Sequence, residues 1–216
     1  MPRHARCVLP SNVTMPETAV VRPPTAANMR LDGGHPALEL VNTIYGQVGG
    51  PVEHDVLATP QDLVIFSGRL GLADSHTPES PAALADARAL RDAVDAVLRG
   101  RMAGAPPPAA AVGVLERAAR RALEAATLAA AGDGLAWRWD PGDAHTPVHR
   151  LARAAVELLT DDAELARLHQ CAGCCWLFLD HSRGAGRRWC SMADCGTEAK
   201  KRRYVQRRRE RRQRAS

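Results

Sequence analysis

Apolar residues recur at intervals of three and four along most of the chain, and this period predicts a series of amphipathic helices. Prolines at a first helical position, such as Pro60 and Pro81, mark where helices begin, and Thr59 can cap the helix that follows it. Segments rich in glycine mark where helices end. The pattern predicts helices over residues 36–45, 60–70, 81–100, 109–131, 147–160 and 163–169.

One segment has instead the two-residue period of a β-strand. Leu135, Trp137 and Trp139 alternate with other residues and share one face of this segment. A strand needs a partner, and the segment before Gly33 is one candidate. We therefore predict a mainly α fold with a minor β component for a helical domain over residues 29–165.

Residues 1–28 show neither period and contain five prolines. This composition is typical of disordered segments, so we predict a disordered leader. No apolar run approaches the ~20 residues of a membrane-spanning helix, and the N-terminal region lacks the apolar segment of a signal peptide. We therefore expect a cytoplasmic protein without a membrane partner.

Charge is distributed unevenly along the chain, although the formal net charge is only +5. Residues 200–216 hold ten of the 29 basic residues and one of the 24 acidic residues, a net charge of +9, which leaves −4 on the rest. This segregation favours a polyanion as the partner of the C-terminal segment.

Four cysteines have the spacing of a metal site. Two residues separate the first pair, four separate the second pair, and fifteen residues lie between the pairs. Such pairs can bring four thiolates to one tetrahedral zinc ion, and Gly173 eases the turn inside the first pair. Two disulfides are the alternative, and they require an oxidising compartment. We predict one structural Zn2+ held by Cys171, Cys174, Cys190 and Cys195.

The residues around these cysteines predict a small zinc module. Cys175 follows a ligand directly, so we interpret it as a small buried apolar residue. His169 and His181 could replace a ligand, but we interpret them as ordinary surface or hairpin residues. The runs 176–179 and 187–190 flank a polar turn and predict a β-hairpin. The tight turn of the first cysteine pair, the hairpin and the basic helix after Cys195 follow one another in the sequence. This order predicts a treble-clef-like zinc finger over residues 166–203.

The finger segment resembles a known family. Cys171-Ala-Gly-Cys174, the residues Trp189-Cys190-Ser191-Met192 and the basic run 200–203 resemble the CGNR zinc finger. Cys175 replaces a residue that is usually glycine in that family. The Cys-Gly-Asn-Arg motif that gives the family its name is here Cys195-Gly196-Thr197-Glu198. Any function of the Asn-Arg pair in the family therefore does not carry over to this chain, whereas the metal site does.

The helical segment also resembles a family. The segments 38–43 and 62–72 and the strand around Trp137 resemble, in this order, the ABATE domain that commonly precedes this finger. The resemblance implies a stress-induced transcription regulator. Because the connection between the two parts is short, we expect the finger to dock on the helical domain. We expect residues 29–165 to fold alone, unless the finger's hairpin is needed to close their core.

Basic residues follow the second cysteine pair and continue into a basic tail over residues 204–216. On a helix they recur at three- and four-residue steps, so one face can contact phosphates. Basic residues of the finger hairpin are candidates for contacts to bases or the minor groove, whereas Glu198 suits the start of the helix. The predicted nucleic-acid contacts are Arg183, Arg187, Arg188, Lys200, Lys201, Arg202, Arg203, Arg207, Arg208 and Arg211.

No motif in the sequence predicts catalysis. A phosphate-binding glycine loop, a serine elbow and a zincin motif are missing, and four cysteines leave zinc no open position for water. His35, Glu39 and Asn42 share one helical face, which is either solvated or part of a pocket for an unknown small-molecule effector. His145 and His149 could clamp a metal, but no third ligand is near in sequence.

Together these features predict a DNA-binding transcription regulator whose helical domain senses or contacts another molecule. The alternative is a module with structural zinc that binds RNA or a protein. An enzyme that acts through the helical domain ranks third, and we expect no enzymatic activity. The sequence leaves the oligomeric state open.

Overall fold

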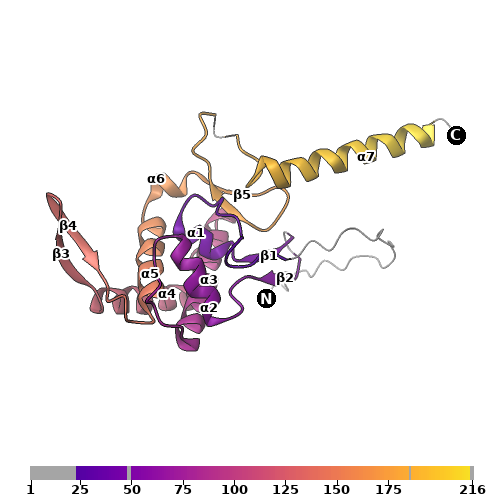
Figure 1. Ribbon diagram of the computed structural model, residues 1–216. Helices are drawn as coiled ribbons and strands as arrows, with labels where there is room; N and C mark the ends of the chain where they lie inside the picture. The colour runs from indigo at the N-terminus through magenta and orange to yellow at the C-terminus, as the bar shows by residue number, and fades with distance from the viewer. Residues whose placement is uncertain (1–22, 48–49, 185, 215–216) are drawn as a thin grey trace.

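The structure is a computed structural model that describes residues 23–47, 50–184 and 186–214 (Figure 1). Most of the predicted leader therefore lies outside the described residues. Residues 23–28 are described, and Ala26 among them is fully buried in the same core as Met29. The prediction of disorder is wrong for these residues, because they pack against the helices.

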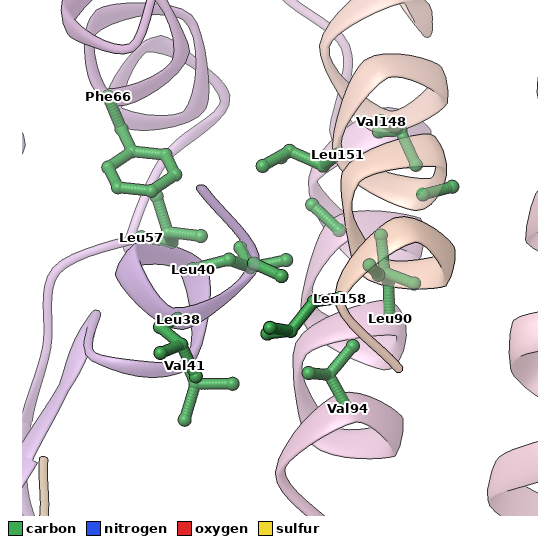
Figure 2. Packing of buried hydrophobic residues seen from close by; sticks show 14 of the residues in the cluster. Leu38, Leu40, Val41, Leu57, Phe66, Leu90, Val94, Val148, Leu151 and Leu158 are labelled. Atoms are coloured by element: carbon green, nitrogen blue, oxygen red, sulfur yellow. The ribbon is translucent and has the colours of Figure 1, made fainter. Parts of the chain in front are cut away.

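A bundle of helices forms the body of the protein. Helices α3, α4 and α5 pack against one another, and α1 lies against α3 and α5. Figure 2 shows leucine and valine side chains of α1, α3 and α5 gathered in the core. The helices of the body are α1 (Pro36–Val41), α2 (Pro60–Arg69), α3 (Pro81–Met102), α4 (Ala109–Glu124), α5 (Thr146–Leu159) and α6 (Asp162–Leu165).

Local capping signals place the starts of the helices where the sequence predicts them. The Thr59 side chain accepts a hydrogen bond from the Asp62 amide, and the Asp62 carboxylate accepts one from the Thr59 amide. This reciprocal capping box satisfies two amides that a helix start leaves without partners. Ser80 caps α3 by a single bond, in which its side chain accepts from the Ala83 amide.

Three of the predicted helices are shorter than the sequence suggests. The first ends at Val41, and the next residues form β1 (Ile44–Gly46), which pairs with β2 (Val52–Asp55). The sixth ends at Leu165, and β5 (Leu168–Gln170) follows it. In each case pairing with another strand outweighs the local helical period, because strand formation depends on partners that periodicity does not reveal.

The fourth predicted helix ends at Glu124, and its last part is the strand β3 (Thr127–Ala131). This strand pairs with β4 (Gly134–Arg138), so it is the partner that the sequence did not identify, and the segment before Gly33 is not. Gly132 adopts a positive φ of 55° in the tight turn between the strands. The two strands form a ribbon that extends beyond the helices (Figure 1).

The finger contributes to the core of the body. Strand β5 pairs in antiparallel fashion with β6 (Leu177–Leu179). Leu168, Leu177 and Leu179 belong to the same buried cluster as the side chains of α1, α3 and α5. We therefore expect residues 29–165 alone to lose part of their core, in line with the alternative that the hairpin closes it.

The fold is mainly helical with short strands, as predicted, and the finger leads into the long helix α7 (Thr197–Arg214). None of the helices described combines the length and the apolar character that crossing a bilayer requires.

Candidate metal centre

The four predicted ligands lie together at the tip of the β5–β6 hairpin. Their sulfur atoms are all within 4.8 Å of one another, and no other group of three or more possible ligands among the described residues meets this condition. Cys171 and Cys174 stand in the loop that joins β5 to β6, whereas Cys195 lies in the turn η1 (Met192–Gly196). The first cysteine pair is thus positioned by the β5–β6 loop, and Cys195 of the second pair is positioned by η1.

A set of hydrogen bonds fixes the first loop. The Cys171 amide donates to the Trp176 carbonyl (2.9 Å), and the Gly173 amide donates to the Cys171 sulfur (3.3 Å). Gly173 has no positive φ, so the turn itself does not require glycine. A Cβ atom at this position would lie 3.1 Å from the Cys195 Cβ, so Gly173 is needed because Cys195 approaches closely.

The hairpin of the finger differs from the predicted one. We expected residues 176–179 to pair with residues 187–190, but β6 pairs with β5 and the metal loop forms the hairpin turn. The returning segment is held separately, since the Ala172 amide donates to the Arg188 carbonyl (2.9 Å). The burial of Leu168 opposite Leu179 explains the preference for β5 as partner.

The donor set fits zinc. Hydrogen bonds from the thiols of Cys174 and Cys190 lower the pKa of the Cys171 thiol, whereas burial raises the pKa of Cys195. Zn2+ takes four ligands in such sites, so these four sulfurs would complete its coordination and leave no position open for water. The protein therefore holds one structural zinc ion, which replaces the protons that the thiols would otherwise share.

The three neighbouring residues lie outside this cluster. The Cys175 sulfur faces the Ile44 carbonyl at 3.5 Å and is half-buried. The His169 ring stacks on Phe178, with ring centroids 5.8 Å apart, and His181 lies 3.4 Å from a Glu164 carboxylate oxygen. These positions agree with their interpretation as residues that do not bind the metal.

The finger is joined to the body by backbone and side-chain hydrogen bonds. Asn42 at the end of α1 forms two of them to Leu177 of β6. Arg99 of α3 donates to the Cys175 carbonyl (2.8 Å). The Leu179 amide donates to the Gly33 carbonyl, and the Cys175 amide donates to the Gly46 carbonyl. The Trp176 indole donates to the Ile44 carbonyl. The predicted docking is therefore an extensive joint.

Glu39 and Asn42 are buried and His35 is half-buried, so these three residues do not form a solvated face. His35 caps α1 by accepting from the Ala37 amide, and burial lowers its pKa. Glu39 is 4% exposed, and one of its oxygens accepts from the Gly34 amide. Burial raises the pKa of Glu39 to about 7. Asn42 bonds to the finger through Leu177, whereas His35 and Glu39 accept hydrogen bonds from the backbone at the start of α1.

The predicted nucleic-acid contacts have exposed side chains, except that Arg187 is half-buried and bonds within the finger. Its guanidinium lies 4.5 Å from the Phe178 ring centroid and donates to the carbonyls of Trp189 and Cys190. Arg187 therefore fixes the segment that carries a metal ligand, and its role as a base contact stays a prediction. Arg188 is exposed and lies over the Trp189 ring.

Sequence reasoning missed two acidic residues that hold the finger in place. Asp180 is buried and accepts hydrogen bonds from the amides of Ser182 and Arg187. Hydrogen bonds from Ser182 and from the Arg187 amide lower the pKa of Asp180 to about 2. Asp194 of η1 forms an ion pair with Arg30. The Asp-x-Ser pattern at 180–182 is typical of a side-chain turn and could have indicated Asp180.

His145 and His149 belong to no group of three or more possible metal ligands among the described residues. The rings of His145 and His149 lie 6.1 Å apart, and Asp143 is 3.5 Å from His149. Burial lowers the pKa of His149. Among the described residues, the four cysteines alone meet the distances that a metal ion requires.

Comparison with known families agrees with this organisation. Residues 34–162 match the ABATE family, described as "Putative stress-induced transcription regulator", and residues 167–208 match the CGNR zinc finger. No curated protein matches the chain. Because the first match covers more than half of the sequence, the chain belongs to the ABATE family and carries a CGNR zinc finger.

Proposed function

We propose that this protein is a DNA-binding transcription regulator in which α7 supplies the affinity for the duplex. The observation that carries the proposal is the surface of this helix. It holds ten basic and two acidic residues, and its side chains from Lys201 to Gln213 are exposed. In Figure 1 α7 extends away from the body. At ~1.5 Å per residue its 18 residues span roughly 27 Å.

The dimensions of α7 suit the proposed ligand. An α-helix with side chains is about 10–12 Å wide, and the major groove of B-DNA is about 12 Å wide. Basic side chains all around such a helix can reach phosphates on both walls of the groove, and release of counterions drives this binding. A polyanion also removes the repulsion among the arginines of the helix.

The metal centre gives α7 a fixed base. Cys195 lies in η1 directly before the helix, and Gly196 is buried between Met192 and Trp189. The Thr197 hydroxyl donates to the Met192 carbonyl (3.0 Å). The start of α7 is therefore bound to the finger, and the finger is bound to the body. We infer that zinc orients the helix so that the body and the DNA keep a defined relation.

Selectivity for sequence needs contacts other than phosphates. We assign this role to Arg183 and Arg188, which are exposed on the finger. Glu198 forms an ion pair with Lys201 (2.7 Å) in the first turn, and this pairing lowers the Glu198 pKa. The ion pair reduces the positive potential of the first turn, so we expect phosphate contacts to begin after it.

The proposal assigns no catalytic activity to the protein. Its zinc has four thiolate ligands and therefore offers no site for a substrate or an activated water. We place the protein in the cytoplasm, where thiols remain reduced and can bind zinc. The body then serves as the part that receives a signal or contacts other proteins.

Binding of fluorescent duplex DNA by the zinc-loaded protein tests this function. We expect the full chain to bind duplex DNA more tightly than double-stranded RNA of the same sequence, because the deep major groove of RNA is too narrow for a helix. Deletion of residues 204–216 should weaken binding to every duplex. Equal or tighter binding to RNA would favour the RNA-binding alternative, and unchanged binding after the deletion would contradict the role of α7.

A further inference from the structure

The β3–β4 ribbon has an apolar face that is exposed in the part of the chain that the structure describes. Leu128 pairs with Trp137 and Ala130 pairs with Leu135, so these four residues lie on one face. Leu128 is 55% exposed and Leu135 is 71% exposed. A two-stranded hairpin is marginally stable alone in water, and exposed apolar surfaces of this kind mark sites of interaction.

The same face continues into an apolar groove at the base of the ribbon. The groove lies between α4 and α5, has a volume of about 200 Å3, and is lined by Leu123, Trp137, Trp139 and Val156. Its floor is fixed, because the Trp139 indole donates to the Ala122 carbonyl (2.8 Å). Trp137 belongs to both the ribbon face and the groove, so the two form one surface.

Charges are arranged in a complementary way at the two ends of this surface. The turn at the tip of the ribbon, residues 132–134, carries one charged residue, Asp133. The rim of the groove carries Arg153, which pairs with Glu157 on the same helix. Arg150 lies over the Trp139 ring beside it. With Arg150, Arg153 and Glu157 the base keeps a net charge of +1, opposite in sign to Asp133 at the tip, so two copies that meet in opposite directions bring opposite charges together.

We propose that this surface binds a second copy of the chain, with the two ribbons antiparallel about a two-fold axis. In this arrangement the tip of each ribbon lies against the groove of its partner. Leu135 then packs beside the partner's groove, and Asp133 faces the arginines at its rim. Such an interface is self-complementary, because each copy supplies both a tip and a groove.

A dimer of this kind holds two α7 helices, one on each copy. Figure 1 places α7 at the opposite end of the molecule from the ribbon, so the proposed contact leaves both helices exposed. Two linked helices increase the avidity for DNA. Only this consequence depends on the proposed function, whereas the dimer itself does not.

Sedimentation equilibrium of the zinc-loaded full chain tests the dimer. We expect the mass to approach twice 23.2 kDa as the concentration rises. Leu135→Asp should give the monomer mass with an unchanged circular dichroism spectrum, because the side chain is 71% exposed. Val52→Asp is the matched control, since Val52 is 63% exposed on β2, and it should remain a dimer.

Reversal of the charges tests the antiparallel arrangement. Asp133→Arg should raise the dimer dissociation constant about tenfold, and adding Arg153→Asp should restore much of the affinity. A wild-type chain that stays monomeric at every concentration would overturn the proposal. So would a dimer that survives Leu135→Asp, because its interface would then lie elsewhere. Failure of either test leaves DNA binding by a monomer unaffected.

Discussion

The side chain of Asn42 forms two hydrogen bonds with the backbone of Leu177, although 135 residues separate them. Its amide nitrogen donates to the Leu177 carbonyl and its oxygen accepts from the Leu177 amide, both at 2.9 Å. Asn42 and Leu177 are both fully buried. The side-chain amide therefore replaces a neighbouring strand for β6 and links the stability of the body to that of the finger.

Replacement of this asparagine should destabilise the whole protein. Asn42→Ala leaves a buried amide and a buried carbonyl of Leu177 without partners, at a cost of about 1–3 kcal/mol for each group. We expect denaturant unfolding to show a loss of roughly 2–6 kcal/mol. Asn28→Ala is the control, because the Asn28 side chain bonds only locally at the surface. A loss no greater than that of the control would contradict the role of Asn42.

Metal analysis should separate the adjacent cysteines 174 and 175. Cys190→Ala removes a ligand, so it should release zinc and unfold the finger, whose metal binding is worth on the order of 10–16 kcal/mol. Cys175→Ala should retain one zinc ion per chain, because its sulfur faces the Ile44 carbonyl and not the cluster. Loss of zinc from Cys175→Ala together with its retention in Cys174→Ala would reverse the assignment.

Gly173→Ala should weaken zinc binding without removing a ligand. Its Cβ would lie 3.1 Å from the Cβ and 3.4 Å from the sulfur of Cys195, so Cys195 must shift slightly from its place in the cluster. We expect about a tenfold loss of zinc affinity in a competition with a chelator. Gly184→Ala is the control within the same finger, because an added Cβ there meets no atom within 4 Å. Equal affinities for the two variants would show that the close approach does not matter.

Glu39 should make the stability depend on pH. Burial raises its pKa to about 7, whereas a carboxyl in the unfolded chain has a pKa near 4.3. The folded state therefore holds an extra proton between these values. The stability contributed by Glu39 is fully present below about pH 4 and is lost as the pH rises through 7. The loss is roughly 4 kcal/mol.

Glu39→Gln keeps the shape of the protonated side chain and removes its titration. The free energy of unfolding of the wild type relative to this variant should fall between pH 5 and pH 8.5. Both proteins contain the same thiols, so the effect of thiol titration cancels in the difference between their free energies of unfolding. A difference that stays constant over this range would show that Glu39 titrates normally.

Local signals in the sequence were sufficient for some elements and for the metal ligands. The capping box of Thr59 and Asp62 and the two-residue spacing of Cys171 and Cys174 involve residues close in sequence, so periodicity and spacing reveal them. Strand β3 was predicted as helix, because its alanines favour a helix and the decisive pairing of Leu128 with Trp137 is a tertiary contact.

The joint between body and finger could not be predicted for a similar reason. The Asn42 side chain is polar, and its position on a helix suggests a solvated face, since the partner at Leu177 lies far along the chain. Arg187 was expected to contact DNA because it is basic, but its Nε and one of its two Nη atoms donate to the carbonyls of Trp189 and Cys190. A charge pattern shows where cations lie in sequence, not which of them the fold engages.

The salt dependence of DNA binding is the most direct test of the proposal that α7 binds phosphates. A variant with Arg207→Gln, Arg208→Gln and Arg211→Gln is compared with a control in which the exposed body residues Arg117, Arg120 and Arg138 become Gln, so that both lose the same charge. The α7 variant should lower the slope of log affinity against log salt by ~0.9 for each lost contact, or about 2.7 in all, with little change in the control. Equal slopes for the two variants would contradict the role of α7 in binding DNA.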